Sequence, residues 1–276
     1  MAEAVTTGAA RIAEALAAAR AEGRAALMPY LIAGFPDAET SAAVADAYAA
    51  SGADLVELGV PFSDPLADGW VIHAAATRAL AAGATLESAL EVCARIASAV
   101  PVVPMVYANM VLARGPAEFG HLLADAGACG AIVPDLPLEE TGEVAEALGD
   151  AGLPLVLLVA PTTPPRRRRR ICERAEGFVY LVSDTRVTGE RDQLPQGLGE
   201  LVAAVRAEAH VPVAVGFGIG SPEQAAAVGR IADGVIIGSR LVRAVAEADG
   251  ASAAGESVAS FLRDCRAALQ AEARVR

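Results

Sequence analysis

The sequence contains no lysine. All 22 of its basic residues are arginine, against 34 acidic residues, and the formal net charge is -12 over 276 residues. Schiff-base aldolases, pyridoxal-phosphate enzymes and Walker-type nucleotide sites each depend on a lysine side chain. We therefore exclude these three kinds of chemistry for this chain.

Histidine and cysteine are also scarce. The three histidines (His73, His121 and His210) are scattered, and the four cysteines are far apart with no C-x-x-C pair. This spacing predicts reduced thiols that pack in a core, no metal centre and no cofactor held by such ligands.

The overall composition predicts a globular protein, because 54% of the residues are hydrophobic and only 20% are charged. The acidic balance argues against nucleic acid and anionic membranes as partners. The apolar runs are too short to span a bilayer, and the first residues lack a basic signal region. We expect a cytoplasmic protein.

Short runs rich in Val, Ile and Leu alternate with longer Ala-rich stretches throughout the chain. Such apolar runs are typical of parallel strands buried on both faces. The expected strands are 26–33, 54–59, 101–107, 130–134, 154–160, 178–183, 211–216 and 232–238. The expected helices between and after them are 38–51, 85–99, 116–126, 138–150, 164–176, 196–208, 221–229 and 239–248, with cap-type residues such as Thr85 with Ser88, and Ser221.

This order predicts an α/β fold, a single (β/α)8 TIM barrel that forms one domain over residues 1–276. The barrel covers about residues 26–250, with an extra N-terminal helix at about 8–22 and a C-terminal helix at about 253–274. A doubly wound open sheet is the rival fold, but no G-x-G-x-x-G follows the first strand.

Five consecutive arginines, at 166–170, form the one charge run in the sequence. A polyanion site is one interpretation. Two prolines directly before the run favour the start of a helix, so we expect a solvated helix face.

Two carboxylates follow the second strand, at the end of a barrel strand where active sites form. Glu57 lies inside an apolar run, so we expect it to point into the barrel mouth or to be buried with a raised pKa, which suits a general acid or base. The alternative is a pair with an arginine inside the barrel. Asp68 lies eleven residues further on and is expected to share this work. Asp64 competes with it, but an Asp before a proline is typical of a turn.

Glycine-rich segments follow the seventh and eighth strands, at 216–221 and 238–239. In barrels, such loops open helices whose backbone N–H groups bind phosphate without a lysine. We therefore predict a phosphate site there.

The polar loop at 183–191 is expected to act as a lid, and Tyr107, Asp135 and Tyr180 are expected to line the site.

The stretch from Glu57 to Gly69, ELGVPFSDPLADG, resembles the signature of the tryptophan synthase alpha chain family. Further segments that match this family are 28–30, 33–34, 107–109, 134–137, 187–189, 216–219 and 238–239. The resemblance covers essentially all of residues 8–250. It implies cleavage of the small-molecule phosphate substrate indole-3-glycerol phosphate to indole and glyceraldehyde 3-phosphate, without a Schiff base or metal.

The resemblance also implies roles for individual residues. Glu57 would protonate indole C3 and help deprotonate the glycerol hydroxyl, and Asp68 would accept a hydrogen bond from the indole N–H. The other residues implied are Tyr30, Tyr107, Tyr180 and Phe217 around the indole, Thr188 closing over it, and Gly189, Gly218, Gly238 and Ser239 around the phosphate.

A pyridoxal-phosphate-bearing beta chain is the partner that the resemblance implies. Residues that match the docking loops are Pro61, Phe62, Asp64, Asn109 and Pro137. Four residues depart from the family pattern: Asp184 and Arg186 in the lid loop, and Trp70 and His73 after Asp68. An arginine in place of a glycine is expected to change how the lid folds, if the backbone there needs a positive φ.

Three functions are compatible with these residues. The first is an alpha chain inside a tryptophan synthase, and the second is a stand-alone lyase that releases indole to another pathway. The third is a non-catalytic subunit that binds phosphate and activates a partner. The presence of both Glu57 and Asp68 counts against the third.

Overall fold

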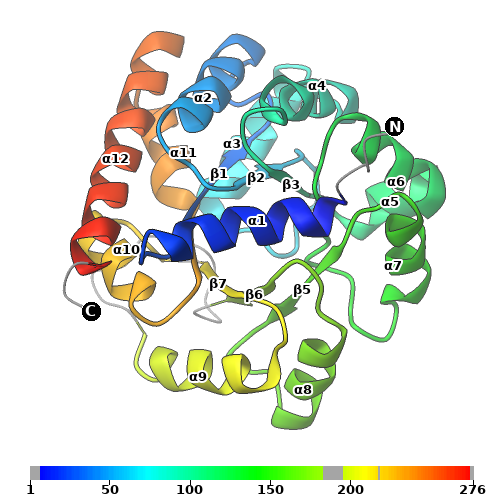
Figure 1. Ribbon diagram of the computed structural model, residues 1–276. Coiled ribbons are helices and arrows are strands. Elements are labelled where there is room, and N and C mark those ends of the chain that lie inside the picture. The colour runs from blue at the N-terminus through cyan, green and yellow to red at the C-terminus, as the bar shows by residue number, and fades with distance from the viewer. Residues whose placement is uncertain (1–6, 183–194, 217, 274–276) are drawn as a thin grey trace, which may run out of the picture.

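A closed barrel of eight parallel strands, hydrogen-bonded in sequence order, forms the centre of the protein (Figure 1). The computed structural model describes residues 7–182, 195–216 and 218–273. The strands are β1 (Ala26–Ile32), β2 (Val56–Gly59), β3 (Val102–Met105), β4 (Ala131–Ile132), β5 (Leu155–Val159), β6 (Val179–Val182), β7 (Val213–Gly216) and β8 (Gly234–Ile237). The predicted (β/α)8 fold is therefore confirmed.

Twelve helices in the described residues surround this barrel. They are α1 (Gly8–Ala21), α2 (Ala38–Ala50), α3 (Trp70–Ala81), α4 (Leu86–Ile96), α5 (Ala108–Arg114), α6 (Pro116–Asp125), α7 (Thr141–Asp150), α8 (Pro165–Arg174), α9 (Leu198–Glu208), α10 (Pro222–Gly229), α11 (Ser239–Ala246) and α12 (Gly250–Ala273). The two flanking helices predicted at about 8–22 and 253–274 correspond to α1 and α12.

Two of the helices, α3 and α5, are absent from the pattern expected from sequence. Gly69 precedes α3 and Tyr107 precedes α5, and neither makes a side-chain cap hydrogen bond. At α4, by contrast, the cap-type residues expected from the sequence are confirmed, because Thr85 and Ser88 form a capping box. The expected fourth strand, 130–134, is also shortened to the two residues of β4.

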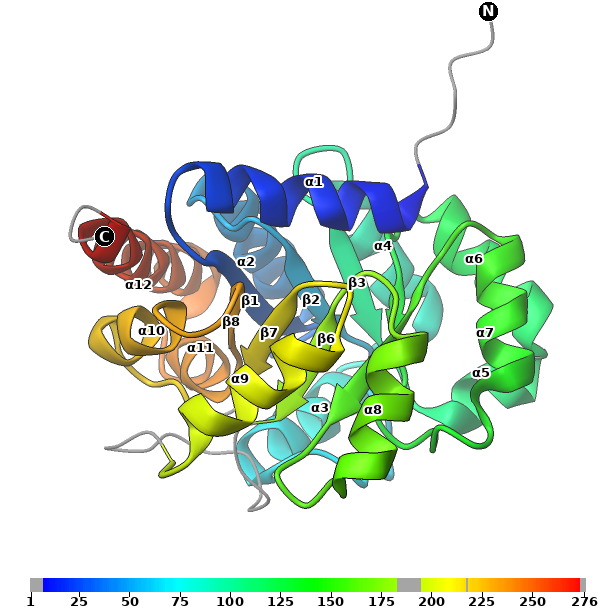
Figure 2. The ribbon, with the colours of Figure 1, turned by 60° about the horizontal axis from the view of Figure 1, so that its bottom comes forward.

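Helix α1 lies across the end of the barrel where the strands begin, and α12 runs beside α2 and α10 (Figures 1 and 2). Ile12 of α1 is fully buried against Gly130 and Gly177, which precede β4 and β6. The buried side chains of α12 recur with helical spacing, at Ala254, Val258, Leu262, Cys265 and Leu269. Both helices therefore close the fold by burying one apolar face.

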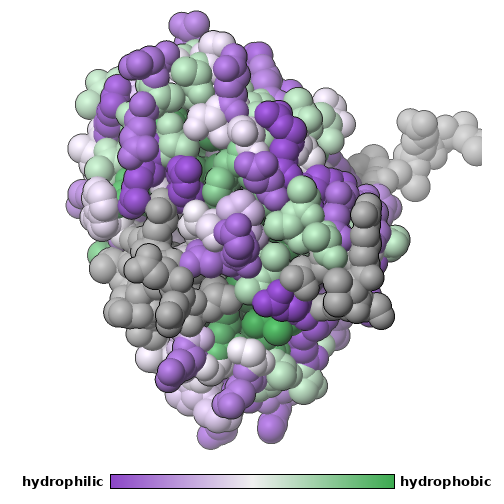
Figure 3. Space-filling view, turned by 90° about the vertical axis from the view of Figure 1, so that its left-hand side faces the viewer, coloured by the Kyte–Doolittle hydropathy of each residue, from purple (hydrophilic) through white to green (hydrophobic). Residues whose placement is uncertain are grey.

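The outer surfaces of these helices are mixed in character. Hydrophilic and apolar residues are interspersed over the face that Figure 3 presents. Among the residues described, no helix combines the length and hydropathy that crossing a bilayer requires. The arginine run covers the first turns of α8, where Arg167 and Arg170 pair with Glu139 and Arg168 pairs with Glu208.

A buried ion pair joins the strand starts under α1. The Arg24 guanidinium is 1% exposed and donates to both Asp54 carboxylate oxygens, at 2.6 and 2.8 Å. Asp54 also accepts the Leu27 N–H, and Arg266 of α12 donates to the Gly52 carbonyl. Arg24 also donates to Glu22 at the end of α1. Two guanidinium groups and the Asp54 carboxylate thus connect α1, β1, the start of β2 and α12.

Replacing Arg24 with methionine will destabilise the protein by about 3–5 kcal/mol, because the Asp54 carboxylate loses its main partner while it remains largely buried. The matched control is Arg95→Met, since Arg95 pairs with Asp46 at about half exposure on both sides. Exposed pairs contribute about 0–1 kcal/mol. Urea unfolding followed by circular dichroism measures both variants, and equal losses of stability would contradict this account.

Candidate active site

Glu57 projects from β2 into the barrel and is 2% exposed. Its register partners are Tyr30 of β1 and Val103 of β3. Burial is the main cause that raises its pKa, to about 8, with a further contribution from the negative charge of Asp68. The Tyr180 hydroxyl opposes this rise by donating a hydrogen bond, while Glu57 Oε2 has no hydrogen-bond partner in the described structure. Glu57 is therefore a carboxyl that can hold a proton at neutral pH.

Asp68 lies in the loop that follows β2 and is only partly buried. Burial raises its pKa, and a hydrogen bond from the Tyr107 hydroxyl and the nearby His73 counteract the rise. The Ala67 N–H donates to the same Tyr107 hydroxyl at 3.3 Å, and Phe62 stacks on its ring with centroids 5.1 Å apart. The two carboxyl groups therefore have different surroundings, which is the condition for separate acid and base roles.

Two glycines make room for tyrosine side chains inside the barrel. A Cβ atom on Gly59 would lie 2.1 Å from the Tyr30 hydroxyl, and one on Gly216 would lie 2.5 Å from the Tyr180 hydroxyl. Burial, with the charges of Glu57 and Asp68, raises the pKa of both tyrosines well above the ordinary value. The spacer role of Gly59 and Gly216 gives no signal in the sequence, because it depends on which strands are neighbours.

Of the predicted phosphate residues, Gly218, Gly238 and Ser239 lie at the carboxyl ends of β7 and β8. Gly218 has a φ of +81°, and Gly238 precedes α11, whose first residue is Ser239 and which has no side-chain cap hydrogen bond. A Cβ atom on Gly238 would lie 3.7 Å from the Tyr30 side chain. The α11 N-terminus therefore offers backbone N–H groups on the β1 side of the barrel mouth.

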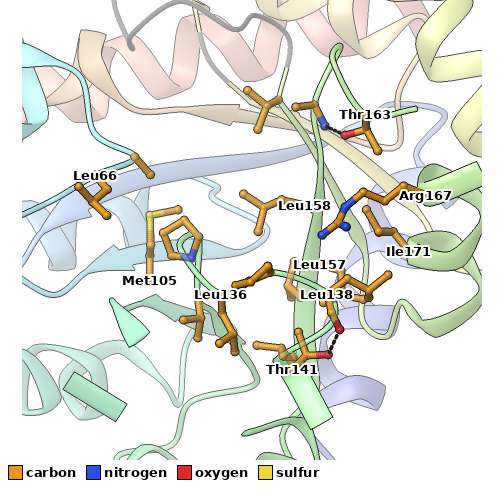
Figure 4. Close-up of a pocket in the computed structure, with 18 of the residues that line it drawn as sticks. Leu66, Met105, Leu136, Leu138, Thr141, Leu157, Leu158, Thr163, Arg167 and Ile171 are labelled. Carbon is orange, nitrogen blue, oxygen red and sulfur yellow. Dashed lines mark hydrogen bonds between the residues drawn. The ribbon is translucent and has the colours of Figure 1, made fainter. Parts of the chain in front are cut away.

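A cavity of ≈ 480 Å³ opens beside Asp68, on the side of the barrel mouth formed by β3, β4 and β5 (Figure 4). Its walls are mainly apolar, and the labelled side chains include Leu66, Met105, Leu136, Leu138, Leu157, Leu158 and Ile171. Two of its threonine hydroxyl groups are already engaged: Thr141 donates to the Leu138 carbonyl at 2.9 Å, and Thr163 accepts the Ala160 N–H at 3.0 Å. The cavity suits a flat apolar ring with one polar edge at Asp68.

The structure also places three other polar residues considered from the sequence. Asp135 accepts the Ala108 N–H at 2.9 Å and so holds the start of α5. Asp64 is exposed, and His73 lies on the exposed face of α3. Five residues singled out from the sequence lie outside the described residues: Asp184, Arg186, Thr188, Gly189 and Phe217.

The described residues contain no group of three or more His, Cys, Asp or Glu side chains that could hold a metal ion. All four cysteines are buried free thiols. The chemistry available in the described site is therefore that of two carboxyl groups, three tyrosine hydroxyls and the backbone N–H groups of the glycine loops.

Comparison with known proteins identifies the family. Residues 16–270 match the family model of the tryptophan synthase alpha chain. The curated relatives include the tryptophan synthase alpha chain of Gloeobacter violaceus, 47% identical over 263 residues, which covers 94% of this chain and 95% of that protein. The alpha chain of a Synechococcus strain is 49% identical over 239 residues, covering 86% of this chain and 89% of that protein. The chain belongs to the tryptophan synthase alpha chain family.

Solved structures agree with this assignment. Tryptophan synthase from Mycobacterium tuberculosis superposes with a TM-score of 0.87 at 37% identity, covering 94% of this chain and 98% of that one. Tryptophan synthase subunit alpha from Legionella pneumophila gives 0.82 at 35%, with 94% and 98% covered. The predicted family and the predicted carbon–carbon lyase activity of the alpha type are confirmed, and neither the stand-alone lyase nor the non-catalytic subunit is favoured.

Replacing Tyr180 with phenylalanine will raise the pKa of Glu57 above its value of about 8, because the hydrogen bond that stabilises the carboxylate is lost. We expect a titration midpoint about one pH unit higher. NMR of ¹³C-labelled glutamate, with Glu57→Gln to assign the signal, measures it. Tyr48→Phe is the control, since the buried Tyr48 hydroxyl donates to the Tyr30 carbonyl instead. An unchanged midpoint in Tyr180→Phe would refute this role.

Glu57 also makes stability depend on pH. Its folded pKa of about 8 lies above the ordinary value of 4.5, so the folded state binds the proton more tightly. The stability this confers is complete below about pH 4.5 and is lost as the pH rises toward 8. The variant Glu57→Gln lacks this loss. Relative to the native chain, it will gain on the order of 5 kcal/mol between about pH 4.5 and pH 9, measured by urea unfolding. A difference in unfolding free energy between the two proteins that does not change with pH would disprove this.

Proposed function

We propose that Glu57 and Asp68 carry the cleavage of indole-3-glycerol phosphate to indole and glyceraldehyde 3-phosphate in this chain. The observation that supports this most strongly is the Glu57 carboxyl, which is buried, has a pKa of about 8 and has an unpartnered Oε2. A carboxyl in this state can donate a proton and accept it back near neutral pH.

The proposed reaction begins with protonation of indole C3 by Glu57. The ring nitrogen then carries the positive charge, and the Asp68 carboxylate stabilises it by accepting a hydrogen bond from the N–H. The hydroxyl on the carbon attached to C3 next gives its proton to Glu57. The bond between that carbon and C3 breaks, its electron pair returns to the ring, and an aldehyde and neutral indole result. Glu57 ends the cycle protonated, as it began.

The proposed substrate spans the barrel mouth. Its phosphate would lie on the backbone of Gly189, Gly218, Gly238 and Ser239, beside the α11 N-terminus. Its indole ring would extend past Tyr30, Tyr107, Tyr180, Thr188 and Phe217 toward the apolar cavity at Asp68. This orientation places the bond to be broken between the two sites, next to Glu57.

A tryptophan synthase beta chain is the partner that membership of the family supports. We propose that it docks at the carboxyl end of the barrel, through the segments of Pro61, Phe62, Asp64, Asn109 and Pro137. Asp64, Asn109 and Pro137 are exposed there, and Leu66 between them is 85% exposed. Exposed apolar side chains beside a site are typical of an interface. The buried free thiols agree with a cytoplasmic location.

The variant Glu57→Gln will lose turnover by about 10²–10⁴-fold while it retains substrate binding, because the amide keeps the shape and cannot transfer the proton. Indole release measures turnover, and calorimetry measures binding of indole-3-glycerol phosphate. Each assay is run with the chain alone and with a beta chain added.

The control for this experiment is Glu14→Gln, an exposed residue of α1. Near-normal turnover of Glu57→Gln would remove Glu57 as the proton carrier. Full activity of the native chain without a beta chain would contradict an obligate dependence on the partner.

A further inference from the structure

The barrel wall opens between β4 and β5 near the catalytic end. These strands pair only at Ala131 with Leu155 and at Ile132 with Val156. Strand β5 continues to Val159 and pairs beyond this point with β6 on its other side. Within the described residues, the edge of β5 that faces β4 therefore has no strand partner from Leu157 onward.

The cavity at Asp68 passes through this opening. Register partners in a parallel sheet point to the same side, so Leu158 faces inward with its partner Tyr180, and Leu157 faces outward. Both line the same cavity, together with Met105 of the barrel interior and Ile171 of α8 outside it. Figure 4 shows Leu157 and Leu158 between Met105 on one side and Arg167 and Ile171 on the other. We call the part between β5, α7 and α8 the side slot.

The side slot is apolar along its length. Its lining includes Leu138, Leu157 and Ile171. The Thr141 hydroxyl donates to the Leu138 carbonyl. Arg167 closes the outer end, and its guanidinium is held by Glu139 at 2.8 Å. The slot therefore has no unpaired charge to offer a ligand, and it favours a small apolar group.

The orientation of the substrate decides which group reaches the slot, and this step rests on the proposed function. Asp68 would bind the indole N–H and lines the cavity, whereas Glu57 is not among its lining residues. In indole, C7 and C6 lie on the N–H side of the six-membered ring, while C4 lies beside C3 and its glycerol chain. The edge with C6 and C7 thus faces the side slot, and C4 faces Glu57.

We propose that this enzyme accepts indole-glycerol phosphates that carry a small apolar substituent at C6 or C7, and that the substituent occupies the side slot. The enzyme therefore cleaves more compounds than the unsubstituted substrate. Whether it accepts a substituent depends on the position of the indole ring that carries it. A group at C4 has no such space and is rejected.

The test compares cleavage of the unsubstituted substrate with its 4-, 6- and 7-chloro derivatives by the full chain, measured as kcat/KM for release of the indole. We expect the value for the 6- or the 7-chloro compound to lie within about fivefold of the parent. The 4-chloro compound will lose about 10–200-fold, the usual cost of one misplaced group in a tight pocket.

Two variants that fill the slot test its location. Ala160→Leu and Leu157→Phe each add bulk to a partly exposed residue that lines the cavity. In both variants, the ratio of kcat/KM for the 6- or 7-chloro substrate to kcat/KM for the parent compound will fall by at least about tenfold. Ala207→Leu, on the exposed face of α9, is the control for a small-to-large change.

The outcomes separate the two proposals. No cleavage of the parent compound would overturn the proposed function. Normal cleavage of the parent, with the 6- and 7-chloro compounds as poor as the 4-chloro compound, would overturn the side slot alone. Retention of the 6- or 7-chloro activity in both filled variants would also overturn it, because the substituent would then lie elsewhere.

Discussion

The burial of the Glu57 carboxyl is the constraint on which the site depends. An ionised carboxylate inside a barrel loses its hydration, so the protein must either neutralise it or supply hydrogen bonds. Here one hydroxyl, from Tyr180, donates to it, and Oε2 is left without a partner. This incomplete compensation raises the pKa to about 8, and it leaves an oxygen free to face a substrate. If both oxygens accepted hydrogen bonds, the carboxylate would be more stable and its pKa would be lower, so it would donate a proton less readily.

The surrounding packing follows from this constraint. Tyrosines from β1 and β6 extend across the barrel toward the carboxyl groups, and the adjacent strands carry glycine where a side chain would collide with them. The tyrosine rings exclude water, which maintains the desolvation of Glu57. Asp68 escapes the same degree of burial because it lies on a loop beside Tyr107 and His73. One barrel mouth thus gives two carboxyl groups different proton affinities.

The two ends of the barrel are stabilised in different ways. At the end where the strands begin, Arg24 and Arg266 pair with Asp54 and Glu22 and connect α1, β1 and α12. At the other end the short β4 leaves the wall open beside Asp68. The unpartnered Glu57 oxygen and the open space are tolerated at the catalytic end because the opposite end supplies well-satisfied contacts.

The order of the strands and the barrel could be predicted from the amino-acid sequence, because apolar runs are local patterns. Carboxyl residues at strand ends and glycine loops are local patterns too, and they led to the prediction that Glu57, Asp68 and the glycine loops form the site. The prediction from the sequence missed α3 and α5, whose starts carry no side-chain cap. It offered Asp135 as part of the site lining, but it gave no sign that this carboxylate also accepts the Ala108 N–H at the start of α5. The three-dimensional arrangement was needed to show that Gly59 and Gly216 are spacers, that Tyr180 bonds to Glu57, and that a slot opens between β4 and β5. Each of these depends on which strands are neighbours and where their pairing stops, and that information is not local to any stretch of the chain.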